Sequence, residues 1–274
     1  DSTGRLHVII GGHHTPSLYR WSDDPANPDA WSDALHLGPA DTYPSLIVDR
    51  DDTLHYIHRE KGDRWQLWYR RRRRGEDWQP PRAIAISPTP GYNHFMQSLT
   101  LDAAGALHLT FMFHYAHDGN ARHCLGRGFV HMQSDDGGDH WHIDGKPCEA
   151  LPVGIDDVDW VVRYPDDQLG QPGTHQDVRI SNHVTDPAGH VWIHASDPHT
   201  PSGYLWRRTE AGWQSHDLAP WLEPAGADTD PNPSAMSVDA QGRLHLVVGH
   251  RPAGQAMTWA DPRVESLEEQ ALIP

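Results

Sequence analysis

Asp102-Ala-Ala-Gly105-Ala-Leu107-His108 leads directly into the apolar run Leu109-Thr-Phe-Met-Phe-His114. Asp side chains bond to nearby backbone groups in tight turns, and Gly tolerates positive φ, so the first part predicts a turn. The apolar run predicts a buried strand. The same signature recurs with small variations at Asp1–His7, Asp49–His55, Asp186–Trp192 and Asp239–His245.

The spacing of the signature predicts the fold. Its apolar residue recurs after 48, 53, 84 and 53 residues, and further apolar runs lie before and after most copies. Three or four strands per repeat of this length are typical of a propeller blade. We therefore predict an all-β protein, a β-propeller with at least five recognisable blades that forms a single domain over residues 1–274.

Two irregularities interrupt the repeat. The 84-residue step contains a stretch rich in Asp, Pro and Gly, about 155–173, which we interpret as a long insertion able to cover a site. The first signature begins at residue 1, so the first blade lacks its preceding strand. Either N-terminal blades of a ring, for example a seven-bladed one, are missing, or the N-terminal strand closes the ring with 265–274. We favour truncation.

Composition limits the partners of the chain. Lys and Arg number 22 against 38 Asp and Glu, for a net charge of −16, which argues against a general nucleic-acid or anionic-membrane surface. No apolar run reaches the roughly 18 residues of a membrane helix. We expect a monomer that is secreted or periplasmic. The 12 Trp residues suit either sugar stacking or propeller cores. Cys124 and Cys148 allow a disulfide, two free thiols or a metal thiolate.

Two further motifs are interpreted as structural. Ser134-Asp-Asp136-Gly-Gly138-Asp-His-Trp141 fits the Asp-box pattern, in which side-chain oxygens cap a hairpin turn and the Trp packs beneath it. The run of five arginines, residues 70–74, ends a predicted strand and is usually a solvated edge that discourages pairing. Attraction of a polyanionic polysaccharide is the alternative role of this run.

Polar residues at the predicted strand ends form the candidate site. Equivalent positions in different blades meet around one mouth of a propeller, so imidazoles and guanidiniums there would form a ring on an otherwise acidic protein. The alternative is that each of these side chains forms a hydrogen bond with a neighbouring backbone group. We interpret His7, His55, His108 and His245 in this second way. The candidate substrate-binding residues are His14, His58, His94, His114, His194, His250 and Arg251.

Tyr43 and Arg59 are the most specific candidate pair of site residues. They are 16 residues apart, on either side of the Asp49 turn. If their strands form a hairpin, both side chains lie at one edge of the blade, so that a phenol and a guanidinium share the mouth. The alternative is a packed Tyr and a solvated Arg.

Three stretches carry a resemblance to a known family. They are Gly11-Gly-His13 after the first signature, Thr42-Tyr-Pro44 with Tyr56-Ile-His-Arg59, and His131 to Trp141 with Gly145-Lys-Pro147 and Leu151-Pro152. In order and spacing, residues 1–152 resemble the BNR-repeat propellers that include ulvan lyases and related polysaccharide lyases. The remainder of the chain matches only as more propeller.

The resemblance implies a β-elimination at a uronic acid, with His13, Tyr43 and Arg59 as catalytic residues. Arg59 would neutralise the carboxylate, because the C5 proton of an ionised uronate is only weakly acidic. Tyr43 would move a proton as a phenolate favoured by neighbouring cations, and His13 would assist. The implied partner is an acidic, ulvan-like polysaccharide, and no organic or redox cofactor is implied.

The chain departs from the family in one respect. Relatives carry another active-site His on the strand before the first signature, and here that strand would lie ahead of Asp1. His14 is a poor substitute, because in a regular strand it points away from His13. Two alternatives stay open: a sialidase-like glycoside hydrolase and a non-catalytic glycan-binding propeller.

A second cluster predicts a metal. Imidazoles and a thiolate suit zinc, and relatives are expected to hold a structural metal, zinc or calcium, in this region. The spacing is not a diagnostic zinc motif, and loop histidines on an ordinary hairpin are the alternative. The candidate ligands are His117, His123, Cys124 and His131.

Overall fold

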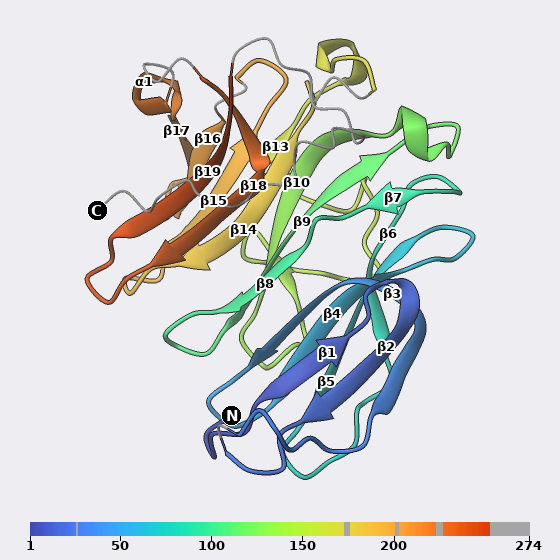
Figure 1. Cartoon of the computed structure of the whole chain (residues 1–274). Coiled ribbons are helices and arrows are strands. Elements are labelled where there is room, and N and C mark those ends of the chain that lie inside the picture. Colours follow the sequence, from blue (N-terminus) through green and yellow to red (C-terminus); the bar gives the residue numbers. More distant parts are fainter. Residues whose placement is uncertain (26, 173–175, 201–202, 223–226, 253–274) are drawn as a thin grey trace.

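The structure is a computed structural model that describes residues 1–25, 27–172, 176–200, 203–222 and 227–252. Side chains are described for all of these except residues 221–234 and 248–252. The chain is all-β and forms several antiparallel sheets (Figure 1). Short helical turns occur at η1 (Ala121–His123), η2 (Asp166–Gln168) and α1 (Ala219–Leu222). Among the described residues, no helix has the length and apolar character needed to cross a membrane.

The sheets follow one another along the chain. The first contains β1 (His7–Ile10), β2 (His13–Trp21), β3 (Leu35–Val48), β4 (Leu54–Glu60), β5 (Gln66–Arg72) and β6 (Arg82–Ile86) in that order. The second contains β7 (Asn93–His94), β8 (Ser98–Leu101), β9 (Leu107–Tyr115), β10 (Leu125–Ser134), β11 (His142–Ile143), β12 (Lys146–Pro147) and β13 (Val162–Arg163). The third contains β14 (Arg179–Thr185), β15 (Val191–Ser196), β16 (Tyr204–Thr209) and β17 (Gly212–Asp217), and the fourth β18 (Ala227–Val238) and β19 (Leu244–Pro252).

Each sequence signature forms the turn that was predicted for it. The five turns lie directly before β1, β4, β9, β15 and β19. In every copy the carboxylate of the first Asp contacts the ring nitrogen of the residue six positions later. The nitrogen-to-oxygen distances are 3.0 Å for His7, 3.1 Å for His55, 3.4 Å for His108, 3.0 Å for Trp192 and 3.3 Å for His245.

The second ring nitrogen of three of these histidines reaches the next strand. His7 and His55 contact the hydroxyls of Tyr19 and Tyr69, each at 2.7 Å, and His108 contacts His131 at 3.0 Å. These partners occupy the same position in the following strand, so one Asp–His link ties the turn to two strands in these three copies. The signature histidines are structural, but they contact side chains and not a neighbouring backbone group, which corrects that part of the prediction.

β3 belongs to two repeats. Residues 35–42 pair with β2 and residues 42–48 pair with β4, and the register shifts between Thr42 and Ser45. We therefore divide the chain into unit 1 (7–42), unit 2 (43–86), unit 3 (93–163), unit 4 (179–217) and unit 5 (227–252). Within the described residues, no strand pairs with the free edge of β1.

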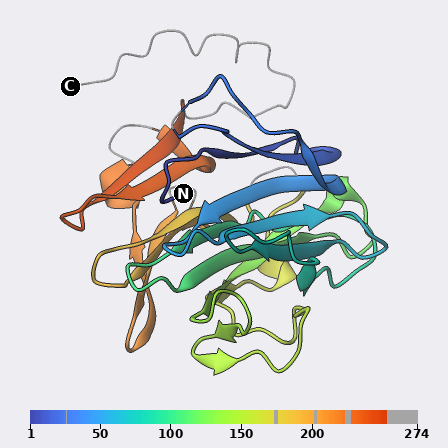
Figure 2. The same cartoon turned by 90° about the horizontal axis from the view of Figure 1, so that it is seen from below.

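Apolar side chains pack between successive units. One cluster joins Tyr19 of unit 1 to Tyr56 of unit 2, a second joins Leu67 to Phe111, and a third joins Phe129 to Ile180. β8 contacts both β3 and β14, and β14 contacts β18, so the units meet along their first strands (Figure 1). In the view from below, the orange last sheet and the dark-blue strands of the first sheet lie above the teal and green strands (Figure 2).

The predicted insertion is tied to unit 3. Within 155–172, β13 pairs with the edge of β10, and Trp160 packs on Phe113 with 5.4 Å between the ring centroids. The stretch 155–172 therefore completes the second sheet. Residue 173 and the segment 265–274 lie outside the described residues.

The five arginines are not a solvated edge throughout, which corrects the prediction. Arg70 and Arg71 are buried, and Arg71 forms an ion pair of 2.6 Å with Asp139. Arg72 lies over the Tyr19 and Trp21 rings, with its guanidinium carbon 5.5 and 5.2 Å from their centroids. Arg71 thus ties the first sheet to the turn between β10 and β11 of the second, Arg72 ties unit 2 to unit 1, and of the five arginines only Arg73 and Arg74 are exposed.

The remaining sequence motifs have defined partners. In the Ser134–Trp141 turn, the Ser134 hydroxyl donates to Asp136 at 2.9 Å and accepts from the Gly138 backbone N–H at 2.8 Å. Trp141 is buried against Tyr69, with ring centroids 5.7 Å apart. Cys124 and Cys148 are both free thiols, so the disulfide is excluded from the three alternatives.

Replacing Asp49 tests the role of the signature carboxylate. Its oxygens accept from the backbone N–H groups of Asp51 and Thr53 at 2.9 and 2.8 Å, and also contact His55. We expect Asp49→Ala to lower the free energy of unfolding by about 2–3 kcal/mol, because buried donors lose their acceptor. Urea unfolding measures this. The matched control Asp51→Ala, on the same turn but exposed, should change it by less than about 0.5 kcal/mol.

Buried neutral histidines predict a loss of stability in acid. Burial lowers the pKa of His183 to about 3, and both of its ring nitrogens contact Thr hydroxyls. A depressed His pKa means that the unfolded chain binds the proton first, so stability present above about pH 6.5 is lost as the pH falls. For His183 this amounts to about 2–3 kcal/mol at pH 4.5. His183→Gln should flatten the decrease in unfolding free energy between pH 7 and 4.5, and an unchanged slope would contradict the assignment.

Candidate active site

A contact between unit 1 and unit 2 positions Tyr43. Gly12 has φ of +114°, and a Cβ atom there would lie 2.6 Å from the Cδ of Pro44, so only glycine allows this approach. The Gly12 carbonyl accepts from the Tyr43 backbone N–H at 2.9 Å. The two motifs Gly11-Gly-His13 and Thr42-Tyr-Pro44 therefore fit against each other, and His13 lies beside Tyr43.

The Tyr43 backbone is in an unusual conformation. Its φ is +56°, in the left-handed region that bulky residues rarely occupy. Its carbonyl accepts a hydrogen bond from the Gln97 side chain of unit 3. The register shift of β3 at this point redirects the side chain away from the regular alternation of the strand. Such backbone strain is concentrated at functional sites, so the structure makes Tyr43 the strongest candidate for a catalytic residue.

Arg59 lies beneath the Tyr43 ring in an aromatic cage. Its guanidinium carbon is 4.6 Å from the ring centroid of Tyr43, 4.4 Å from that of Trp65 and 5.0 Å from that of Tyr92. The side chain is fully buried, and Nη1 donates to the Asn93 carbonyl at 3.0 Å. Among the residues that the structure describes, Nε and Nη2 have no hydrogen-bond partner. A buried guanidinium thus keeps two donors that a ligand could use.

A row of rings continues from Tyr43 across the units. His13 lies on one side of Tyr43 with 5.7 Å between ring centroids, and His94 lies on the other side at 4.4 Å. His114 follows His94 at 6.1 Å, and its Nε2 is 3.7 Å from a carboxylate oxygen of Asp177. Units 1 to 3, together with Asp177 just before unit 4, therefore contribute to one continuous row of polar side chains, in which His114 and Asp177 are buried.

The titration of the site residues differs from the expectation. The pKa of Tyr43 is raised above its usual value, because burial and the neighbouring Tyr92 outweigh the opposing charge of Arg59. The expectation that cations favour a Tyr43 phenolate is therefore wrong for the free protein. Burial and Arg59 lower the pKa of His94 to about 3. The site combines a protonated phenol with a neutral imidazole beside it.

Some predicted site residues join this row and others do not. His13, Tyr43, Arg59, His94 and His114 come together, while their roles stay predictions. His14 is exposed with φ of +57°, and its ring lies 4.7 Å from His13. The expectation that it points away from His13 is wrong, because the strand is irregular there.

His58 and His194 are corrections to the predicted set. His58 is fully buried on the other face of β4 from Arg59, near Asp41, because neighbouring residues of a strand face opposite sides. His194 is fully buried and packs against Gly203. His250 and Arg251 lie on β19, and their side chains are outside the described residues.

The predicted metal cluster is not assembled, which corrects the ligand set. His117 pairs with Asp166 at 2.6 Å, and His123 pairs with Asp118 at 2.7 Å. Cys124 is buried under the Tyr92 carbonyl, and burial raises the pKa of its thiol to about 11. His131 faces His108 in the interior. Alternation along β10 and separate loop partners keep the four side chains apart.

Sequence reasoning missed several residues of the site. Trp65 and Tyr92 complete the cage around Arg59, and the row is extended by Asp177, just before unit 4, and by Arg179, at the start of unit 4. The signal that could have found the unit 3 and unit 4 residues is position within the repeat. His94 and Arg179 begin the first strands of units 3 and 4, as Tyr43 begins that of unit 2.

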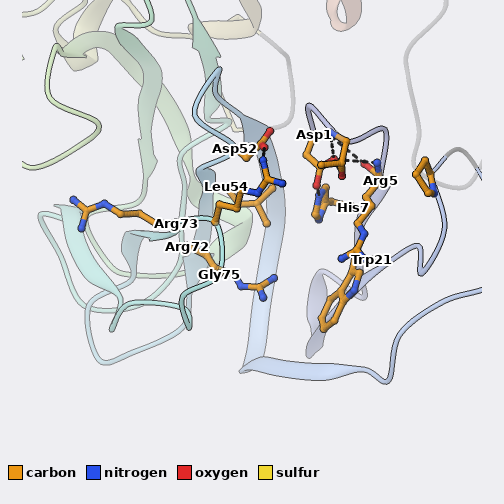
Figure 3. A pocket seen from close by; sticks show the side chains of 12 residues that line it. Asp1, Arg5, His7, Trp21, Asp52, Leu54, Arg72, Arg73 and Gly75 are labelled. Atoms are coloured by element: carbon orange, nitrogen blue, oxygen red, sulfur yellow. Dashed lines mark hydrogen bonds and ion pairs between the residues drawn. The ribbon is translucent and has the colours of Figure 1, made fainter.

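A cavity of about 460 Å³ lies at the other end of the strands, beside the signature turns (Figure 3). Asp1, Arg5, His7 and Trp21 line one side of it, and Asp52, Leu54 and Arg72 the other. Arg74 binds Asp52 at 2.9 Å there, so opposite charges already neutralise part of the lining. It shares no residue with the row that contains Tyr43.

Solved structures with similar folds include polysaccharide lyases. An ulvan lyase of family PL25, bound to -[GlcA(1-4)Rha3S]-, superposes with a TM-score of 0.65 at 16% identity, covering 81% of this chain and 57% of its own. The polysaccharide lyase Uly1 gives a TM-score of 0.56 at 13% identity, covering 92% and 67%. At these identities the likeness concerns the fold, and the chain spans little more than half the length of the ulvan lyase. No curated protein sequence matches the chain.

The repeated signature and the antiparallel sheets define a BNR-type repeat protein. Residues 1–221 match the BNR repeat-containing family. The chain belongs to that family.

Proposed function

We propose that this protein is a polysaccharide lyase that cleaves a uronic-acid-containing, ulvan-like glycan by β-elimination. The observation that carries the proposal is the position of the Tyr43 phenol, between the His13 and His94 rings and over the Arg59 guanidinium. The similar folds of the PL25 ulvan lyase and Uly1 support this choice of substrate class. In this account the repeat units are blades of a β-propeller, and the protein acts outside the cytoplasm.

The reaction needs one proton acceptor and one proton donor. The neutral imidazole of His94 takes the C5 proton of the uronate, and His13 assists. The C5–H electrons form the C4=C5 double bond as the C4–O4 bond breaks, and the Tyr43 phenol donates its proton to the leaving O4. A protonated phenol beside neutral His94 matches these two tasks in the free protein.

Arg59 supplies the charge that the reaction requires. Removal of the C5 proton places negative charge on the carboxylate, and a guanidinium beside it stabilises that charge. The unpaired Nε and Nη2 are the donors that a uronate carboxylate takes up. Because Arg59 is fully buried by three rings, binding requires the Tyr43 or Tyr92 ring to turn aside.

Removing the Tyr43 hydroxyl tests the proton transfer. Incubation with ulvan should produce the ultraviolet absorbance of a conjugated, unsaturated uronate. We expect Tyr43→Phe to lower kcat by at least about a hundredfold, because the leaving oxygen loses its donor. His117→Ala, at an exposed histidine paired with Asp166, is the control and should keep full activity.

Other outcomes of that assay support other functions. New reducing ends without the absorbance band indicate a hydrolase, and binding without either product indicates a glycan-binding protein. A fully active Tyr43→Phe protein would refute the proton-donor role.

Arg59→Lys tests carboxylate recognition. A lysine keeps the positive charge but loses the planar pair of donors. We expect kcat/KM on ulvan to fall by about 10- to 1,000-fold, consistent with the loss of one transition-state hydrogen bond. Initial rates with the native and the carboxyl-reduced polysaccharide measure the effect. The carboxyl-reduced glycan should not react with either protein, and its cleavage by the wild-type protein would exclude Arg59 as a carboxylate ligand.

A further inference from the structure

A buried group of ligand atoms lies behind the candidate active site. Asp41, His58 and Glu60 each present one atom, and these three atoms lie within 4.8 Å of one another. Asp41 and His58 are fully buried, whereas the Glu60 side chain is 30% exposed. The group is therefore closed on one side and open to solvent at Glu60.

Three buried polar atoms of this group lack hydrogen-bond partners among the residues that the structure describes. They are both ring nitrogens of His58 and Oδ1 of Asp41. Oδ2 of Asp41 accepts from the Tyr56 hydroxyl at 2.9 Å, which fixes the carboxylate. The Tyr56 ring also stacks on His58 with 4.8 Å between centroids. Leaving buried polar atoms unpaired is costly, so the group requires a further partner.

The distances match those around a bridging cation. Nε2 of His58 is 3.5 Å from Oδ1 of Asp41 and 3.8 Å from Oε2 of Glu60. A direct charge-assisted hydrogen bond would bring such atoms to about 2.7–2.9 Å. Two ligands of a tetrahedral zinc ion, with bonds of about 2.0–2.1 Å, lie roughly 3.3–3.4 Å apart. The observed spacing is close to that of zinc ligands.

We propose that Asp41, His58 and Glu60 bind one Zn²⁺ ion, with a water molecule as the fourth ligand on the open side. Imidazole and carboxylate ligands suit zinc, and two carboxylates neutralise its charge. Arg70 on β5 also acts on both carboxylates, but within the described residues no ion pair joins it to either.

The position of this site gives it a consequence for the active site. Asp41 precedes Tyr43 by two residues on β3, and His58 and Glu60 flank Arg59 on β4. A bound ion would link these strands directly behind the phenol and the guanidinium. It would hold the strand pair together without touching the substrate. The zinc site does not depend on the proposed lyase activity.

Zinc binding can be measured without any activity. The full chain is stripped with EDTA, titrated with ZnSO₄ by calorimetry, and desalted for metal analysis by mass spectrometry. We expect one Zn²⁺ per chain, and an affinity loss of at least about a hundredfold in His58→Gln and Glu60→Gln, since even outer-sphere partners of metal sites are worth 10–100-fold. His36→Gln, at an exposed histidine on β3, is the matched control and should bind as the wild type does.

A second control separates this site from other ligands. The double variant His123→Ala/Cys124→Ser should also retain the zinc. Urea unfolding in EDTA checks that each variant folds. If His58→Gln does not fold, Glu60→Gln is the informative variant. Absence of zinc from the wild type after titration would overturn the proposal. So would zinc binding that survives both His58→Gln and Glu60→Gln.

Discussion

Pro44 packs against the bare backbone of Gly12, and the location of the candidate active site depends on this contact. It sets β2 of unit 1 against the beginning of unit 2, where the Tyr43 backbone takes a positive φ. The phenol then lies between His13 and His94, with Arg59 below it. A larger residue at position 12 would separate the two units, and the side chains from different repeats would no longer meet.

The repeat supplies the rigidity that this strained position needs. In each unit an Asp carboxylate fixes the turn and binds a ring nitrogen six residues later. Apolar clusters between successive units then hold the sheets together. Because the turns and the candidate site residues lie at opposite ends of the same strands, the stabilising contacts and the candidate site occupy separate parts of each unit. Because of this separation, the side chains in the row of rings can differ without disturbing the turns.

The strands and the pairing of Tyr43 with Arg59 could be predicted because both follow from local sequence. A turn signature followed by an apolar run fixes a strand, and 16 residues around a tight turn bring two side chains to one edge. His58 faces the opposite side of β4 from Arg59 because side chains alternate along a strand. The predicted ring of strand-end residues did not take this alternation into account. The aromatic cage, the left-handed Tyr43 and the dispersed metal ligands depend on contacts between units, and a single sequence does not record these contacts.

We propose that the Tyr43 site breaks a glycosidic bond by elimination and not by hydrolysis. Mass spectrometry of the products formed from ulvan in ¹⁸O-labelled water distinguishes the two reactions. We expect unsaturated non-reducing ends that are one water lighter than the corresponding hydrolysis products and contain no solvent oxygen. Products that carry one ¹⁸O atom at each cleaved bond, or no cleavage at all, would contradict it.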